Sequence, residues 1–235
     1  MTSNSYPEPE YKWTNFGWGD DIGPWKYQIL PQEQITEKLR LYAYAEDDKE
    51  TGISSITFQP CLNEDSKSQD RRAIHSWNLR NGTWKFIGVF DGVYYFILSD
   101  YRRLINSQSP GHAGHETVDH TIEVLPLKVK AKLEELLDKS ENYHLPPNVV
   151  SSALQDAIVE FDDSTLADFA GLFPGGIRGT LDLSDEEIDK IINDGGENLR
   201  KVHNCMRGTT ALIALIDPQG DNVWIANLGD CEARK

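Results

Sequence analysis

Two aspartates stand where a β-strand is predicted to end, and each is next to a glycine. Asp91 and Gly92 follow the apolar run TWKFIGVF. Gly229 and Asp230 close the run NVWIANLGD. A carboxylate at a strand end, beside a glycine with an exposed carbonyl oxygen, provides part of the oxygen shell that Mg²⁺ and Mn²⁺ prefer. Asp-Gly and Gly-Asp pairs also form ordinary turns, so local chemistry leaves a metal site and a simple turn both open.

Hydrophobic periodicity predicts the elements that must position these residues. Strands are expected at 39–46, 52–59, 83–90, 209–217 and 222–230, and helices at 126–139, 148–161 and 184–196. The last helix opens with a capping box, in which Ser184 accepts from the Glu187 amide while Glu187 reaches back. The order of strands, then helices, then a strand pair predicts an α+β fold in which an antiparallel core is faced by helices.

The composition is that of a globular domain. A chain of 235 residues can bury a sizeable core. Its net charge of −15 counts against a nucleic-acid partner, which would require a basic face. The most apolar run, Val93–Leu98, is far shorter than the roughly 20 residues that span a bilayer, so no membrane partner is expected. Residues 1–34 are rich in Pro, Gly and Trp and are predicted to be an irregular arm before a domain at 35–235.

The cysteines and the N-terminus favour an intracellular location. Cys61, Cys205 and Cys231 have no C-x-x-C spacing, which is typical of reduced thiols rather than a disulfide framework or zinc site. The opening MTSNSYPEPEYKW has no basic flank followed by an apolar stretch, so no secretory signal is predicted. The cytoplasm is therefore the default expectation.

Three motifs in order carry a family resemblance. FIGVFDG, later followed by GHAG, then GTTALIAL and VWIANLGDCEAR, resemble the metal-dependent serine/threonine protein phosphatases of type 2C, the PPM family. That family has a strand ending in F-D-G-H-x-G, a G-[ST]-T-A strand and a strand of the type W-x-A-N-x-G-D-S-R-A. SQDRR at 68–72 is similar to the E-D-R-R of the pyruvate dehydrogenase phosphatase branch, which adds the mitochondrion as a second expected location. The resemblance covers most of 35–235.

The resemblance implies a sandwich of two antiparallel sheets flanked by helices, in αββα layers, with its C-terminal part lying beyond Lys235. It also implies two or more Mg²⁺ or Mn²⁺ ions that activate a water, which hydrolyses phosphoserine or phosphothreonine in a phosphoprotein substrate. On this resemblance the metal ligands are Asp91, the Gly92 carbonyl, Asp70 and, at a weaker additional site, Asp230. His112 is the expected general acid that protonates the leaving alkoxide.

Departures from the family pattern lower the expected activity. Gln69 stands where the family has Glu, and Glu64 and Asp65 nearby leave the local register open. Cys231 and Glu232 replace Ser and Arg in the last motif. The aspartates of the family's later D-G and D-N motifs would lie beyond the end of this sequence. The chain is therefore expected to be impaired or inactive as a phosphatase, the alternative being a non-catalytic pseudophosphatase or interaction module.

Residues 93–110 interrupt the first motif. Without Val93–Gly111 the sequence reads KFIGVFDGHAGHETVDH, an uninterrupted family motif. We interpret the segment as a translated intron, since a GGT codon for Gly92 would supply the donor GT and CCA-G at Pro110–Gly111 the acceptor AG. The alternative is a true surface insertion, because long surface loops add little closure entropy. Sequencing the transcript across this junction distinguishes the two.

Overall fold

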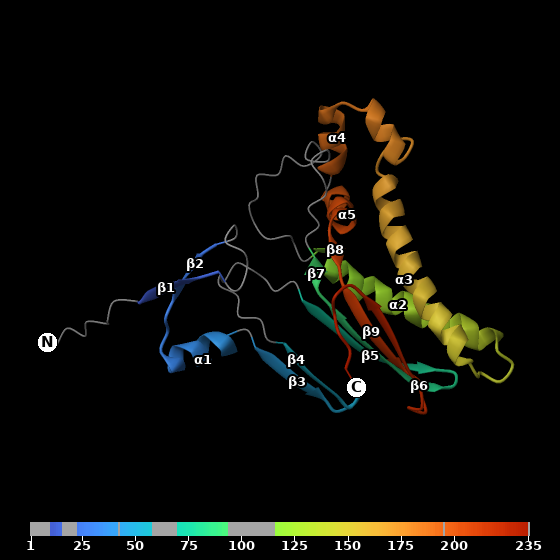
Figure 1. The fold of residues 1–235 in the computed structure, drawn as a ribbon. Helices are drawn as coiled ribbons and strands as arrows, with labels where there is room; N and C mark the ends of the chain where they lie inside the picture. Colours follow the sequence, from blue (N-terminus) through green and yellow to red (C-terminus); the bar gives the residue numbers. More distant parts are fainter. Residues whose placement is uncertain are drawn as a thin grey trace. The chain divides into compact units, whose positions relative to one another are not determined.

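The computed structural model describes residues 10–15, 23–41, 43–57, 70–93, 116–194 and 196–234 (Figure 1). Contacts divide the chain into two compact units, Met1–Asp65 and Ser66–Lys235. The composition of the sequence favours a boundary after residue 34 instead. Among the helices that the structure describes, none combines the length and the apolar character needed to cross a membrane.

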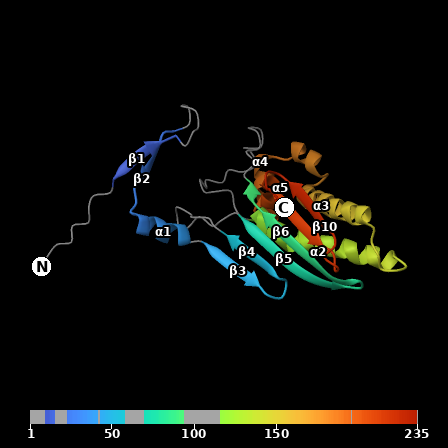
Figure 2. The same cartoon turned by 60° about the horizontal axis from the view of Figure 1, so that its bottom comes forward.

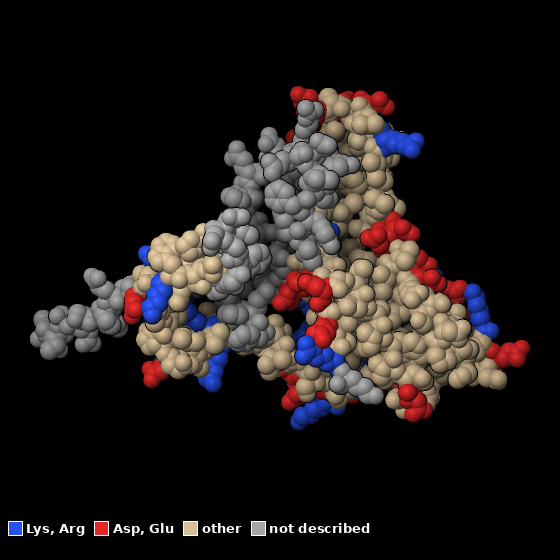
Figure 3. Space-filling view, in the orientation of Figure 1, with Lys and Arg blue, Asp and Glu red and all other residues tan. Residues whose placement is uncertain are grey.

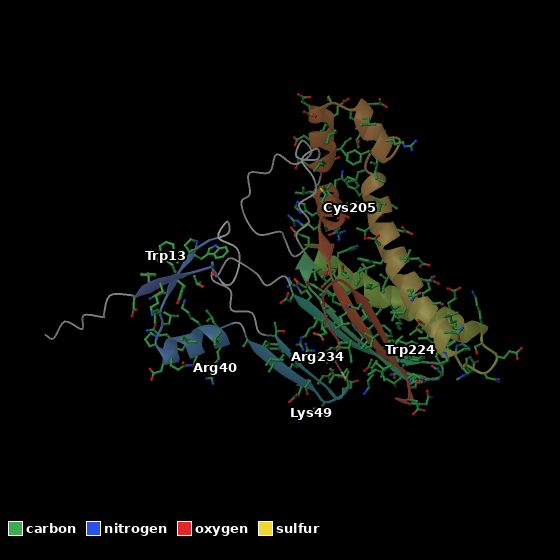
Figure 4. All side chains as sticks on the ribbon, viewed as in Figure 1. Trp13, Arg40, Lys49, Cys205, Trp224 and Arg234 are labelled. Carbon is green, nitrogen blue, oxygen red and sulfur yellow. The ribbon has the colours of Figure 1, made fainter. Side chains whose placement is uncertain are left out.

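The first unit consists of short elements. They are β1 (Tyr11–Thr14), β2 (Trp25–Gln28), α1 (Gln32–Arg40), β3 (Tyr44–Asp48) and β4 (Ile53–Thr57). β1 pairs antiparallel with β2, and β3 pairs antiparallel with β4. The sequence predicts no regular structure before residue 34, yet the first hairpin lies there. Its aromatic residues are all exposed, from 41% for Tyr27 to 63% for Trp13, which Figure 4 labels.

The strand predicted at 39–46 is displaced toward the C-terminus. Leu39 and Arg40 end α1, and the strand starts only at Tyr44. Leu and Arg are strong helix formers, so the alternation that predicted a strand competes locally with helix propensity. The following turn is stabilised by Asp48, whose Oδ1 accepts from the amides of Glu50 (2.9 Å) and Thr51 (3.2 Å).

The second unit contains the longer elements. They are β5 (Arg71–Leu79), β6 (Gly82–Phe90), β7 (Gly92–Val93), α2 (Glu116–Lys139), α3 (Pro147–Ala170), the 3-10 helix η2 (Ile177–Asp182), α4 (Asp185–Ile192), α5 (Glu197–Met206), β8 (Gly208–Thr209), β9 (Ala211–Ile216) and β10 (Val223–Leu228). Four strands form an antiparallel sheet in the order β10-β9-β6-β5, and β7 pairs antiparallel with β8. α2 and α3 pack together against one face of this sheet (Figures 1 and 2). The predicted α+β fold is confirmed at this level.

The helix-facing side of the sheet forms the main core. Alternate residues of the central strands are buried there, namely Trp84, Phe86 and Phe90 of β6 and Ala211, Ile213 and Leu215 of β9. They pack with one stripe of α2: Leu125, Val129, Leu133 and Leu137. Trp84 also contacts Trp224 of β10, with ring centroids 5.7 Å apart, and the Trp224 indole N–H donates to the Pro147 carbonyl at 2.9 Å (Figure 4).

The opposite side of the sheet, here called the outer face, is also rich in apolar residues. It carries Ile74, Ile87, Val89, Leu212, Ala214, Ile216, Val223 and Ile225, which alternate with the core residues along each strand. Val89 is 46%, Ile225 51% and Val223 56% exposed. The surface over β9 and β10 is largely free of charged side chains (Figure 3). Such an apolar area is unusual for a strand face in contact with water.

A smaller helical cluster extends beyond the end of the sheet. Phe173, Ile188, Ile192 and Val202 are buried together between α4, α5 and the end of α3. The capping box predicted at Ser184 is confirmed: its hydroxyl accepts from the Glu187 amide at 3.2 Å, and the Glu187 carboxylate accepts from the Ser184 amide at 2.8 Å. α4 ends at Ile192, earlier than predicted, and Gly196 in a left-handed conformation begins α5 instead.

Candidate functional site

Asp70 and Asp91 lie opposite one another at the end of two neighbouring strands. The β5–β6 ladder ends with Arg71 paired to Phe90, and one more step of the same register brings Asp70 against Asp91. Phe90 is buried under the helices, and Arg71 Nε donates to Asp119 of α2 at 2.6 Å. Because side chains alternate along a strand, both aspartates project on the outer face.

The two carboxyl groups interact directly. Burial raises the pKa of Asp70 above the usual 3.8, and the negative charge of Asp91 and a hydrogen bond between the two carboxyl groups raise it further. The positive charge of Arg71 opposes this rise in pKa but does not cancel it. Two carboxylates that share one position favour binding a proton or a cation between them.

β8 and β9 hold Asp91 from the other side. The Thr210 amide donates to the Asp91 carbonyl at 2.8 Å, and the Asp91 amide donates to the Thr210 hydroxyl at 3.2 Å. The next pair along the chain is Gly92 and Thr209. Since carbonyl groups alternate in direction along a strand, the Gly92 carbonyl points away from β8. That orientation leaves it free of the β7–β8 ladder, as a metal ligand requires.

Asp230 lies near this pair but not in it. Continuing the β9–β10 register places Gly229 opposite Thr210, and a Cβ on Gly229 would lie only 2.7 Å from Thr210 Cγ2. Asp230 is exposed. Asp230 lies beyond the end of β10, and two strand spacings, about 10 Å, separate this end of β10 from the end of β6 that precedes Asp91. At this separation Asp230 lies beside the Asp70–Asp91 pair and does not share a ligand set with it.

His112 and Gln69, two other residues singled out from the sequence, lie outside the described residues. Glu64 and Asp65 lie outside them as well. Among the described residues no group of three or more His, Cys, Asp or Glu side chains could hold a metal ion. The donor chemistry of Asp70, Asp91 and the Gly92 carbonyl nevertheless fits one hard divalent cation that keeps several waters.

A second polar cluster ties the start of α2 to β8. Arg207, directly before β8, forms an ion pair with Glu116, and His203 Nδ1 lies 3.3 Å from the same carboxylate. Burial alone would raise the pKa of Glu116, but a hydrogen bond that its own backbone amide donates to the carboxylate, together with the charge of Arg207, lowers it overall. Glu116 is therefore ionised at neutral pH and fixes the helix beside the strand that holds Asp91.

Sequence reasoning missed Thr209 and Thr210 as part of the site. Both residues were noted only as part of the family-like motif GTTALIAL. A threonine in an apolar strand does not by itself indicate a functional role. What could have indicated them is register: β6 and β9 align in one antiparallel register that sets Thr210 against Asp91. Cys231, which stands where the last family motif has Ser, has its Sγ 3.0 Å from the Thr210 hydroxyl.

Comparison with models of known protein families finds none that matches this chain. Comparison with curated proteins finds no match either.

Proposed function

We propose that this chain derives from the metal-dependent serine/threonine protein phosphatases of type 2C and that Asp70 and Asp91 bind a Mg²⁺ or Mn²⁺ ion. The observation that carries the proposal is the direct opposition of two carboxylates at a strand end. Like charges opposite one another in a sheet destabilise it. A cation bound between Asp70 and Asp91 would offset this repulsion and would explain why the two carboxylates face one another.

The apolar outer face of the sheet supports the two-sheet sandwich that is expected of these phosphatases. An antiparallel sheet often leaves one side in water, and that side is then mostly polar. Here exposed valines and isoleucines occupy it, including Val89, Val223 and Ile225. A second sheet packed on this face would give the two-sheet sandwich of the phosphatases, and Asp70 and Asp91 would then lie at the edge of the interface between the sheets.

The residues of the site have distinct roles in the proposed chemistry. Asp70 and Asp91 hold the cation, and the Gly92 carbonyl completes the protein side of its shell. When bound, such an ion lowers the pKa of a coordinated water toward neutrality and so supplies the nucleophile for a phosphate ester. Asp230 would serve a weaker neighbouring site, and His112 would protonate the leaving serine or threonine alkoxide.

Isothermal titration with Mn²⁺ tests the cation site. The wild-type chain is expected to release or absorb heat on binding, and Asp91→Ala is expected to abolish it. Asp163→Ala is the matched control, because it removes an exposed aspartate of α3 far along the chain from the site. Equal binding by the wild type and Asp91→Ala would contradict the assignment.

Turnover is expected to be low or absent even if the ion binds. Assay of a phosphothreonine peptide with Mn²⁺ measures it, and activity approaching that of an intact phosphatase would contradict the expected impairment. A chain that joins Gly92 directly to His112 tests the role of the insertion, since it restores the uninterrupted motif. We expect tighter Mn²⁺ binding from that shorter chain.

The alternative function is a non-catalytic interaction module. It is favoured by Gln69, which cannot contribute the negative charge of the family's Glu. It is also consistent with the number of ligands, since among the described residues only two carboxylates converge. Mn²⁺ binding without any turnover, by both the full and the joined chain, would select this alternative.

A further inference from the structure

Thr210 makes an unusual exchange of hydrogen bonds with Asp91. In a hydrogen-bonded pair of an antiparallel ladder, each residue donates its amide to the other's carbonyl. Here the Thr210 amide does so, at 2.8 Å, but the Asp91 amide donates to the Thr210 hydroxyl at 3.2 Å. A side-chain oxygen therefore replaces a backbone carbonyl as the acceptor. As a result, Thr210 alone binds both the backbone amide and the backbone carbonyl of Asp91.

The neighbouring hydroxyl completes this arrangement. Thr209 Oγ1 lies 3.0 Å from the Asp91 carbonyl oxygen and 2.8 Å from that of Thr210, so it can donate to either. The Thr210 carbonyl thus has a partner although Asp91 does not bond to it. The exchange leaves the Asp91 amide and carbonyl and the Thr210 carbonyl all hydrogen-bonded at the end of the ladder.

The side chain of Thr210 is itself held in place from the opposite direction. Only 6% of Thr210 is exposed. Its hydroxyl lies 3.0 Å from Cys231 Sγ, and its methyl group fills the space where a side chain on residue 229 would be. A hydroxyl that accepts from an amide keeps its own hydrogen, which it can donate to the Cys231 sulfur. The Thr210 rotamer is therefore fixed on both sides.

We propose that Thr210 is a positioning residue of this site: its hydroxyl holds the Asp91 peptide so that the Asp91 carboxylate faces Asp70 in the arrangement that binds a cation. The inference rests on the proposed function where it concerns the cation. The hold on Asp91 can be measured in the metal-free protein, so the two can fail separately.

Amide hydrogen exchange at Asp91, followed by NMR in the metal-free full chain, tests the hold. Thr210→Val keeps the shape and the backbone bond but removes the acceptor, and the Asp91 amide is expected to exchange about tenfold faster. Thr210→Ser restores the hydroxyl and is expected to stay within about twofold of wild type. Thr83→Val is the matched control, because Thr83 lies on β6 and its hydroxyl donates to Asn78 instead.

Mn²⁺ binding to the same variants tests the consequence for the site. Thr210→Val is expected to raise the dissociation constant for Mn²⁺ about tenfold. Thr210→Ser is expected to recover most of the lost affinity. If Thr210 acts in folding alone, Thr210→Val will have a lower urea midpoint, but Thr210→Val and Thr210→Ser will bind Mn²⁺ with equal affinity.

Unchanged exchange of the Asp91 amide in a folded Thr210→Val chain would overturn the inference. If Thr210→Val does not fold, the wild type decides: an Asp91 amide that exchanges as fast as in an unfolded chain also overturns it. If the wild type binds no Mn²⁺ while the amide responds as expected, the cation site fails and the hold on Asp91 stands.

Discussion

Asp70 is the residue whose chemistry most depends on its place in the sheet. Its carboxyl group would be unremarkable in a turn, but the β5–β6 register sets it against Asp91, and the raised pKa follows from burial and that neighbour. A group whose pKa is raised on folding stabilises the fold below its unfolded value, near 3.8, and this stabilisation is lost as pH rises through the folded pKa. At neutral pH, above its raised pKa, ionised Asp70 therefore opposes folding.

Asp70→Asn is expected to stabilise the metal-free chain at pH 7, by about 0.5 kcal/mol, because it removes one of two opposed carboxylates. The gain should shrink as pH falls through the raised pKa of Asp70, because the wild-type carboxyl takes up a proton there. Urea unfolding at several pH values measures it. Asp163→Asn serves as control, and a loss of stability in Asp70→Asn at pH 7 would contradict the explanation.

Gly229 is required by both its conformation and its surroundings. Its φ is +102°, and a Cβ there would lie 2.7 Å from Thr210 Cγ2. Gly229→Ala is expected to destabilise the second unit by about 2 kcal/mol or more. Gly220→Ala is the comparison, because Gly220 also has a positive φ, +74°, but has open space around it. Equal urea midpoints for the two variants would show that the close approach to Thr210 has no energetic effect.

At the scale of elements, α4 depends on its first turn. It is a short helix with two buried isoleucines, Ile188 and Ile192, and the capping box satisfies the amides of Ser184 and Glu187. Isolated helices of this length are unstable in water, so the cap and the small core beneath it act together.

Ser184→Ala is expected to destabilise the α4 region by about 1 kcal/mol, since the cap of the Glu187 amide is lost. Ser152→Ala is the comparison, because Ser152 is exposed within α3 and alanine is the better helix former there. Hydrogen exchange of α4 amides relative to those of α3 measures the difference. Equal protection in both variants would argue against the cap.

Elements with a strong local pattern were predictable. The strand at 83–90, the strand pair near the C-terminus and the capping box at Ser184 were all confirmed, because apolar alternation and cap chemistry are local. β5 was missed, since RRAIHSWNL begins with two arginines and reads as the end of a polar connection. It becomes a strand because β6 pairs along its whole length.

The site was only partly predictable, for a related reason. Asp91 could be singled out from its own neighbours in the sequence, and Asp70 only through a resemblance. The opposition of Asp70 and Asp91 depends on strand register, and so does the place of Thr210. One sequence does not determine which residues face one another across strands.

The start of α2 was predicted at residue 126, whereas the helix starts at Glu116 and contains Pro126.

At the scale of the whole molecule, the second unit contains three partly buried histidines. Burial lowers the pKa of His75, His120 and His203, and a nearby arginine contributes for the last two. A histidine whose pKa is lowered on folding stabilises the fold above its unfolded value near 6.5, and this stabilisation is lost as pH falls toward the folded pKa. Asp70 acts in the opposite direction.

The free energy of unfolding of the metal-free chain is therefore expected to fall between pH 7.5 and 5.5. Each histidine contributes about 0.5 kcal/mol or less, because solvent screens these partly exposed groups. His120→Phe keeps the aromatic contact with Phe161 and should reduce the fall. Urea unfolding at both pH values checks this, and an equal or larger fall in the variant would contradict the assignment to His120.

The contact between Trp84 and Trp224 gives the protein a built-in optical signal. The two indoles belong to strands that are not direct neighbours, since β9 lies between β6 and β10, and their N–H groups are fixed by Asn81 and the Pro147 carbonyl. Their electronic transitions couple only while the sheet and α3 remain packed. Near-ultraviolet circular dichroism at the indole bands can thus separate a natively packed chain from one that has kept only its helices.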